Sequence, residues 1–417
     1  MKQVEKFHIF LLLLLVPLVG LAAGNFQTTT TGWHLAGIRI EFYLFVMTLV
    51  GIAFFHEKAL FIAVTGLVSI FLVRMFSTPF DPAEHLSNEW EILLNLFGLL
   101  LGFALLAKLF EESGVPDRIP AMLPGNWTGP LLLLMLVFVM SSFLDNIAAA
   151  MIGGSIALVI FRQKVHIGYL AAIVAASNAG GAGSVVGDTT TTMMWIDGVA
   201  PEIILPAYLA AIPAFLIFGT LASRQQFKLQ PVVKVRNEKQ HPISWKQLGI
   251  CLLILAGAIS TNILLDFPAL GVWIALAIGA LLVKMPWGEV RNSLHGTFFL
   301  LAVVSCASMM PVEELPEASW QSAFALGLVS SVFDNIPLTK LALDQSNYDW
   351  ALLAYAVGFG GSLTWFGSSA GVAITNLFPD GRNLKKWIAS SWYLVIAYAV
   401  GFLFLFLLLG WHPHYHN

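Results

Sequence analysis

Apolar runs long enough to cross a lipid bilayer recur along this chain of 417 residues, separated by short polar segments. Hydrophobic residues make up 58% of the sequence and charged residues only 11%. Inside a bilayer the backbone N–H and C=O groups must bond to one another, which a helix of about 20 apolar residues achieves. The sequence therefore predicts an all-α polytopic membrane protein without a separate soluble domain.

We expect eleven spanning helices, two of which, at 166–195 and 350–378, are broken by glycine and hydroxyl residues. Two further apolar stretches, at 130–161 and 319–343, carry polar residues near their middles, which favours re-entrant hairpins over single spans. The uninterrupted spans are expected at residues 7–24, 38–55, 59–76, 91–110, 203–221, 248–265, 269–283, 297–310 and 388–409.

Basic residues indicate how these spans are oriented. With the N-terminus in the cytoplasm and the C-terminus outside, all but three of the 21 Lys and Arg residues fall on the cytoplasmic side, as the positive-inside rule predicts. The exceptions are Arg39, Arg74 and Lys340. The basic segment 223–247 is then a cytoplasmic linker. Residues 1–24 are expected to be either a retained helix or a cleaved signal peptide, because lysines, a leucine run and small residues describe both.

Three landmarks recur in the same order in the segments 25–222 and 248–417, which indicates an internal duplication. Each half has five spans and one hairpin, an odd number of crossings. We therefore expect repeats of inverted topology, with substrate bound near the midplane between broken helices. The landmarks are EESG at 111–114 with EELP at 313–316, SSFLDNI at 141–147 with SSVFDNI at 330–336, and Gly180, Gly181 and Gly187 with Gly360, Gly361 and Gly367.

Acidic residues lie inside the apolar stretches. Asp145 and Asp334 occur in the middle of the two hairpins, and Asp188 follows a glycine-rich break. A carboxylate at the centre of a bilayer costs about 2.5 to 3.5 kcal/mol, so such residues usually have a function. Amides and hydroxyls accompany these acids. The candidate site residues are Asp145, Asn146, Asn178, Asp188, Thr189, Thr190, Asp334 and Asn335, with Ser184, Ser362, Ser368 and Ser369 as weaker additions.

This set of side chains is rich in oxygen and contains no thiolate or imidazole. Carboxylate, amide, hydroxyl and backbone carbonyl oxygens suit hard cations such as Na⁺ or Li⁺. Carboxylates crowded together in a low dielectric cannot all be ionised, so protons and cations compete for them. A site exposed alternately to the two sides would then exchange one for the other. We expect no cofactor, and Na⁺ held as a transported substrate by Asp145, Asn146, Asp188, Asp334 and Asn335.

Four strings carry a resemblance to a known family: DNI in both hairpins, NAGGAGSVVGDTTTTMMW at 178–195 and VGFGGSLTWFGSSAGVA at 357–373. They resemble bacterial NhaD-type sodium/proton antiporters of the ion transporter superfamily, whose members include arsenite permease-like and citrate transporter-like proteins. The resemblance implies Na⁺ or Li⁺ exchange for H⁺, an elevator-type transport domain, a homodimer through scaffold helices, and a bacterial inner membrane. It adds Thr191 to the site and makes Glu111 a candidate proton relay, with a merely solvated glutamate as the alternative.

The first hairpin departs from the family pattern. Its DNI is followed by AAAM, whereas the family often has proline and threonine there, as this chain does at Pro337 and Thr339 in the second hairpin. A tryptophan like Trp90 is also missing from the second half, which has Leu294 and His295 in that region. The first departure bears on ion selectivity more than on fold.

Two other functions involve buried acids in a membrane. A sodium-coupled transporter of di- or tricarboxylates or oxyanions shares the superfamily's architecture, but an Asp at each hairpin tip repels an anion unless a cation neutralises it. An intramembrane aspartyl protease needs two acids that share a proton, but its GxGD motif is absent, since residues 184–188 read SVVGD. We therefore expect no enzyme activity, and as partners we expect protons, monovalent cations and the lipid bilayer, but no nucleic acid.

Overall fold

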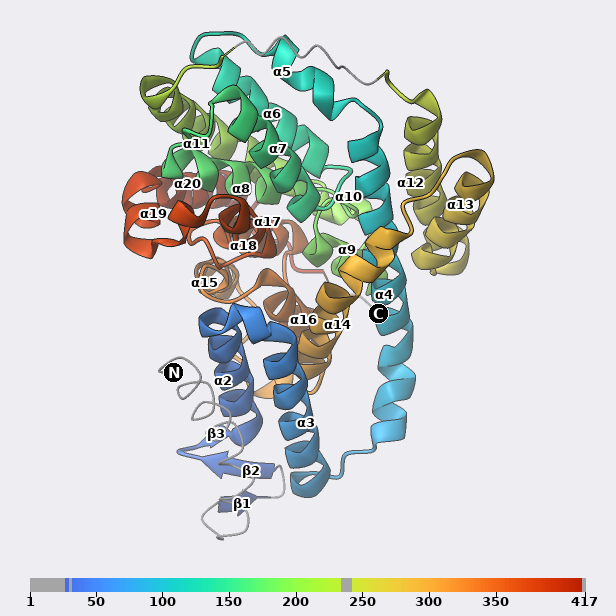
Figure 1. Cartoon of the computed structure of the whole chain (residues 1–417). Helices are drawn as coiled ribbons and strands as arrows, with labels where there is room; N and C mark the ends of the chain where they lie inside the picture. Colours follow the sequence, from blue (N-terminus) through green and yellow to red (C-terminus); the bar gives the residue numbers. More distant parts are fainter. Residues whose placement is uncertain (1–26, 30–31, 234–241, 415–417) are drawn as a thin grey trace, which may run out of the picture.

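A computed structural model describes residues 27–29, 32–233 and 242–414, so the predicted span at 7–24 lies outside the described residues (Figure 1). Helices dominate this part of the chain. They form two groups. These contact each other mainly where α4 (Pro82–Glu112) and α14 (Gly288–Ser308) of one group meet α7 (Asn146–Ile160), α9 (Thr189–Ile196) and α16 (Asn335–Gln345) of the other.

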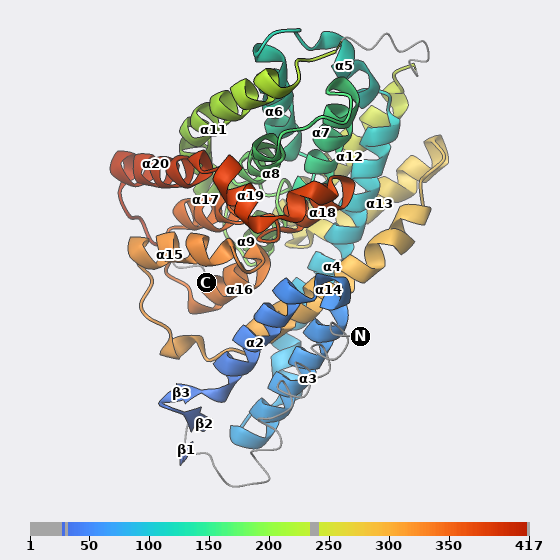
Figure 2. The ribbon, with the colours of Figure 1, turned by 60° about the vertical axis from the view of Figure 1, so that its left-hand side comes forward.

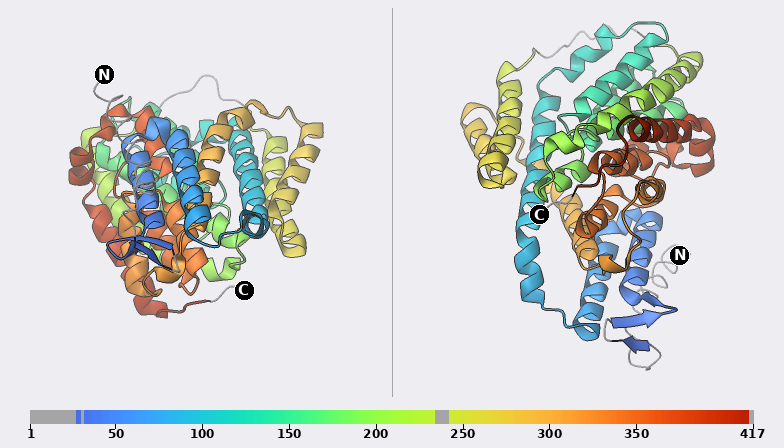
Figure 3. Two further views of the ribbon diagram at one scale, coloured as in Figure 1. Left: turned by 90° about the horizontal axis from the view of Figure 1, so that it is seen from below. Right: turned by 180° about the vertical axis from the view of Figure 1, so that it is seen from behind.

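Six helices form the first group, which we call the α4 group. Its longest member, α4 (Pro82–Glu112), is capped by Asp81, whose carboxylate accepts a hydrogen bond from the Ala83 N–H group at 2.8 Å. Figure 1 shows α4 as a long column with α12 and α13 beside it, and both views in Figure 3 place α12 and α13 at the periphery. The other members are α2 (Ile40–Phe54), α3 (Ala59–Ser77), α12 (Trp245–Leu265), α13 (Pro268–Leu282) and α14 (Gly288–Ser308).

The second group, which we call the hairpin group, consists of shorter helices joined by breaks. Figure 2 shows its helices from the second half, α17–α20, lying among those from the first half. From the first half come α6 (Thr128–Ser141), α7 (Asn146–Ile160), α8 (Ile167–Gly181), α9 (Thr189–Ile196), α10 (Pro201–Ile204) and α11 (Ala207–Leu229). From the second half come α15 (Trp320–Ser330), α16 (Asn335–Gln345), α17 (Trp350–Gly360), α18 (Ser369–Leu377), α19 (Leu384–Ser390) and α20 (Tyr393–Leu409).

The hairpin group has a break at each of the two hairpin tips and in each of the two broken helices. The helix that follows each of these four breaks is capped at its N-terminus by a side chain. The first N–H groups of a helix lack partners within it, and a side-chain oxygen just before the helix satisfies one of them. At all four breaks that oxygen accepts a backbone hydrogen bond of 3.1 to 3.3 Å. Local helix chemistry therefore positions all three predicted site acids. The caps are Asp145 before α7, Asp188 before α9, Asp334 before α16 and Ser368 before α18.

The two halves of the chain interlock in the hairpin group. α7 packs against α18, α9 against α16, and α8 against α17, so each contact joins one half to the other. Each hairpin is also tied to the broken helix of its own half. The Ser141 hydroxyl donates to the Ser177 carbonyl oxygen at 2.6 Å, and the Ser330 hydroxyl donates to the Val357 carbonyl oxygen at 2.7 Å. The two SSxxDNI strings therefore make corresponding contacts.

Five helical segments in the described part of the chain are long and apolar enough to cross a membrane: α3, α4, α10 with α11, α12 and α14. The pair α19–α20 would be a sixth, but it bends by 60°, where the sequence predicts the single span 388–409. The Trp387 side chain explains the bend, because it is buried and its ring N–H donates to the Ser362 carbonyl oxygen at 3.4 Å, which holds α19 against the hairpin group. The protein is thus a mostly helical, multi-pass membrane protein.

Several predicted boundaries differ from the observed ones. α4 and α14 begin at Pro82 and Gly288, well before the predicted positions 91 and 297, because their first turns are polar. The predicted linker 223–247 begins inside α11 and ends inside α12, and its residues 234–241 lie outside the described part.

A small antiparallel sheet precedes α2, so the all-α prediction is wrong in this segment. Its strands are β1 (Gln27–Thr29), β2 (Gly32–Leu35) and β3 (Ile38–Arg39). Ala36 and Gly37 connect β2 to β3 with φ angles of 53° and 81°, as a two-residue hairpin turn requires. Strands of two to four residues are too short to show a recognisable alternation in sequence.

Candidate functional site

Asp188 joins the two hairpins at the centre of the candidate site. Its buried carboxylate accepts a hydrogen bond from the Asn146 amide on Oδ1 at 3.3 Å. The Asn335 amide donates to Oδ2 of the same carboxylate at 3.4 Å. Asn146 is the first residue of α7 and Asn335 the first residue of α16. Equivalent amides from the two halves of the chain therefore meet on one acid.

Asn178 extends this network to the second broken helix. Its amide NH₂ group donates to the Ser362 hydroxyl at 3.0 Å and to the Ser368 hydroxyl at 3.2 Å. Its carbonyl oxygen accepts a hydrogen bond from the Asn146 amide at 3.1 Å. All of these side chains are buried, and buried polar groups are stable only when they are hydrogen-bonded. Together with the Asn335–Asp188 hydrogen bond, the network therefore joins all four breaks in one arrangement.

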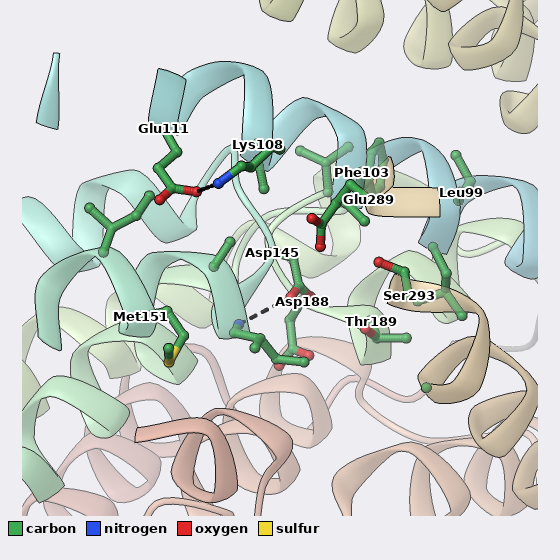
Figure 4. A pocket seen from close by; sticks show the side chains of 18 of the residues that line it. Leu99, Phe103, Lys108, Glu111, Asp145, Met151, Asp188, Thr189, Glu289 and Ser293 are labelled. Carbon is green, nitrogen blue, oxygen red and sulfur yellow. Dashed lines mark hydrogen bonds and ion pairs between the residues drawn. The ribbon is translucent and has the colours of Figure 1, made fainter. Parts of the chain in front are cut away.

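Asp145 faces a cavity of about 690 Å³ that lies between the two helix groups. Figure 4 shows its carboxylate next to Asp188, with Thr189 nearby, and all three residues line the cavity. From there the cavity extends between α4 and α7 to Lys108 and Glu111, which form an ion pair of 2.8 Å. Asp145 and Asp188 therefore border the same cavity as this ion pair.

Asp334 lies on the side of the network away from the cavity and is not one of its lining residues. Its carboxylate accepts hydrogen bonds from the Ser369 hydroxyl at 2.9 Å and from the Ile336 N–H group at 3.3 Å. Asp188 interacts electrostatically with both Asp145 and Asp334. The fold therefore brings the three acids predicted from sequence within electrostatic range of one another, although each comes from a different helix.

The hydroxyl groups that follow Asp188 have different environments. Thr189 lines the cavity. The Thr190 hydroxyl is buried, and it makes no hydrogen bond of normal geometry within the described chain. By contrast, the Thr191 hydroxyl donates to the Ser184 and Asp188 carbonyl oxygens at 2.6 and 2.9 Å. Thr191 therefore stabilises the break before α9, as does Ser184, whereas the Thr189 and Thr190 side chains lie beside the Asp145 and Asp188 carboxylates.

Two of the five predicted Na⁺ ligands, Asn146 and Asn335, contact a third, Asp188. Across the described ranges, no group of three or more His, Cys, Asp or Glu side chains is close enough to hold a metal ion. Instead, the Asn146 and Asn335 amides direct their NH₂ groups at the Asp188 carboxylate. A hard cation binds through oxygen atoms, so at Asp188 it would use the carboxylate lone pairs that these amides leave free.

The structure separates Glu111 from this network and adds residues that the sequence did not indicate. Glu111 lies near the C-terminal end of α4, paired with Lys108, and its side chain is 53% exposed. Glu289 and Ser293 of α14 line the cavity opposite α4 (Figure 4). In the sequence they lie in a polar segment before the predicted span 297–310. The longer α14 carries them into the cavity, and the polar stretch WGEVRNS was the available signal.

Comparisons with known proteins bear on this site. The family model described as CitMHS, citrate transporter, matches residues 42–360. The chain is 28% identical over 282 residues to Sodium/proton antiporter 1 of Arabidopsis thaliana, which covers 58% of this chain and 49% of that protein. It is 25% identical over 332 residues to the Na⁺/H⁺ antiporter NhaD of Vibrio cholerae, covering 66% and 69% of the two chains. A 46 kDa membrane protein of Mycobacterium leprae is 23% identical over 402 residues, 84% and 92% of the two chains. The chain thus spans about half the length of the Arabidopsis relative.

Proposed function

The chain belongs to the CitMHS citrate transporter family of the ion transporter superfamily, and from this premise we propose that it exchanges Na⁺ or Li⁺ for H⁺ across a membrane. Members of this superfamily are secondary transporters. Several relatives are named Na⁺/H⁺ antiporters, which confirms the resemblance found in the sequence and supports exchange of a cation for a proton.

The observation that carries the proposal is the Asp188 carboxylate shared by the Asn146 and Asn335 amides. A proton on this carboxylate and a cation at the same oxygens exclude each other, because both need the same lone pairs. Asp145 and Asp334, within electrostatic range, add to the negative charge that attracts a cation. We therefore assign cation and proton binding to these three acids, with Asn146, Asn178, Asn335, Thr189, Thr190, Ser362, Ser368 and Ser369 as polar neighbours.

Alternating access is proposed to use an inverted repeat with two re-entrant hairpins. The order α6–α9 in the first half matches α15–α18 in the second, and capping side chains occupy corresponding positions. In an elevator mechanism the hairpin group is the transport domain and the α4 group is the scaffold. The cavity between the two groups is then the path from the site to one side of the membrane.

Sodium-coupled transport of a di- or tricarboxylate is the alternative, because the description of the family names citrate. The surroundings of Asp188 oppose this function. Its hydrogen-bond partners within the described residues are neutral amides and a backbone N–H group, with no Lys or Arg to attract an anion. Three acids without a bound cation repel a carboxylate substrate.

Proteoliposomes that contain a pH-sensitive dye test the proposed exchange. External Na⁺ or Li⁺ should raise the internal pH, and both Asp145→Asn and Asp334→Asn should abolish this change. Asp266→Asn is the matched control, because Asp266 caps α12 in an exposed loop distant from the site. Na⁺-dependent uptake of citrate or succinate without proton movement would favour the alternative.

We further propose a homodimer through the α4 group, in a bacterial inner membrane with the C-terminus outside. Large apolar side chains on α12 and α13 support an interface there, since Leu252, Ile263 and Leu281 are 68%, 75% and 87% exposed. Disulfide crosslinking of a Leu281→Cys variant in membranes should give a dimer band, with Val46→Cys on α2 as the comparison. Equal crosslinking at both positions would point to random collision.

A further inference from the structure

A lysine is buried among acids at the boundary between the two helix groups. Lys340 of α16 has a side chain that is only 2% exposed. Its Nζ atom lies 3.1 Å from the Glu89 carboxylate of α4 and 2.6 Å from the Asp344 carboxylate one turn along α16. Asp197 and His85 lie within electrostatic range of Lys340. The sequence predicts Lys340 as one of three basic residues on the outer side, but gives no sign of its burial or its partners.

The Lys340–Glu89 ion pair lies outside the cavity, beyond the end that Leu96 marks on α4. Residues of α4 that line the cavity begin at Leu96 and continue to Glu111. At 1.5 Å per residue, Glu89 lies about 10 Å along the axis from Leu96 and about 33 Å from Glu111. α4 therefore contacts the hairpin group through an ion pair at one end and borders an open cavity toward the other.

We propose that the Lys340–Glu89 ion pair is a latch that holds the second hairpin, α15–α16, against α4 while the cavity is open. Glu89 belongs to the α4 group and Lys340 to the hairpin group, so movement of one group along the other must separate them. The inference rests on the alternating access of the proposed function, but not on the identity of the transported ion.

Asp344 makes this latch releasable. A buried charge that loses its only partner is strongly destabilising, so an isolated Lys340–Glu89 pair would resist separation. Asp344 lies four residues after Lys340 on the same helix and moves with it. Lys340 therefore keeps a carboxylate partner when Glu89 leaves. Within the Lys340–Glu89 pair, the Glu89 side chain is the more accessible, at 15% exposed against 2%, and its carboxylate becomes hydrated on release.

A reporter cysteine in the cavity tests the latch without any ion gradient. Ser155 of α7 lines the cavity and is exposed, whereas the native Cys251 and Cys306 are buried. A Ser155→Cys variant in inside-out vesicles is labelled with a membrane-impermeant maleimide. Adding Glu89→Gln should lower the labelling rate by about threefold or more, because loss of the latch favours the state in which this cavity is closed. Glu84→Gln, an exposed glutamate on the same helix, should leave the rate unchanged.

Charge reversal supplies the rescue. Asp344 would repel a glutamate at position 340, so the swap is made in an Asp344→Asn background. There the double variant Glu89→Lys with Lys340→Glu preserves the net charge and the pair, so its labelling rate should return to within about twofold of the Asp344→Asn parent. Glu89→Asp, which retains the charge on a shorter side chain, should give an intermediate rate, and it serves if Glu89→Gln does not fold. The latch is overturned if Glu89→Gln behaves as Glu84→Gln does, or if the double variant labels as slowly as Glu89→Gln. If Glu89→Gln lowers the labelling rate but the protein shows no Na⁺/H⁺ exchange, the latch proposal stands and only the proposed exchange is refuted.

Discussion

The carboxylate of Asp188 accepts a hydrogen bond from the amide of Asn335 at 3.4 Å, although the two residues lie 147 positions apart in the chain. Asp188 caps the second part of a broken helix in the first half, and Asn335 begins the second arm of the hairpin in the other half. The site is thus assembled from both halves. If the two halves of the chain move relative to each other, the groups that donate hydrogen bonds to the Asp188 carboxylate change.

Replacing Asp188 by asparagine should remove exchange while preserving the fold. Asparagine is as good a helix N-cap as aspartate, but its NH₂ group faces one of the two amides that donate to Asp188, so the free energy of unfolding should fall by about 1 to 3 kcal/mol. The charge that binds the cation and the proton is lost, so we expect the exchange rate to fall by about 100-fold or more. Dye-loaded proteoliposomes and thermal unfolding of the purified protein measure the two effects. Residual exchange near the parent rate would move the ion site to the other two acids.

The two amides on Asp188 should differ in their contribution to stability. Asn146→Ala removes hydrogen bonds to both Asp188 and Asn178, whereas Asn335→Ala removes a single bond of 3.4 Å. At about 1 kcal/mol for each buried bond, Asn146→Ala should be the more destabilising change by about 1 kcal/mol. Parallel thermal unfolding of the two variants in detergent tests this. An equal or larger loss for Asn335→Ala would show that the long bond is the stronger one.

Thr190→Val should weaken Na⁺ binding without lowering the stability of the protein. The buried Thr190 hydroxyl makes no hydrogen bond of normal geometry within the described chain, so its replacement by a methyl group should leave the melting temperature unchanged or slightly raised. If this hydroxyl contributes an oxygen to the cation, the Na⁺ concentration for half-maximal exchange should rise by about tenfold, or about 1.4 kcal/mol. Thr191→Val is the matched comparison, because it breaks two backbone contacts and should lower the melting temperature. An unchanged Na⁺ dependence in Thr190→Val would exclude this hydroxyl as a ligand.

Two glycines allow the hairpins to approach the broken helices. A Cβ atom at Gly180 would lie 2.1 Å from the Phe138 carbonyl oxygen, and one at Gly360 would lie 1.9 Å from the Gly327 carbonyl oxygen. Alanine at either position should therefore destabilise the protein by about 2 kcal/mol or more, because backbone must move. Gly249→Ala in α12 meets no atom within 4 Å and should stabilise by up to about 1 kcal/mol. Melting temperatures of the three variants, measured together, test the contrast.

Local patterns predicted the helices and their breaks well. Hydropathy located α2, α3, α12 and α13 to within a few residues, because an apolar run records burial in lipid or protein at each position. Asp145, Asp188 and Asp334 marked three of the four breaks, since a polar cap is a local signal. The same reasoning missed the three-stranded sheet and the α19–α20 bend. Those features depend on a two-residue turn and on the packing of Trp387, which a hydropathy window does not resolve.

The sequence by itself determined the membrane class, the family, the repeated landmarks and the identity of the buried acids, because the cost of burying a charge or a peptide group is set locally. The tertiary structure decided which groups meet. It brought Asn178 to Ser362 and Ser368, directed both hairpin amides at Asp188, and buried Lys340 against Glu89. These contacts join residues far apart in the chain, and their partners are chosen by how α7, α9, α16 and α18 pack against one another. No local pattern encodes that choice.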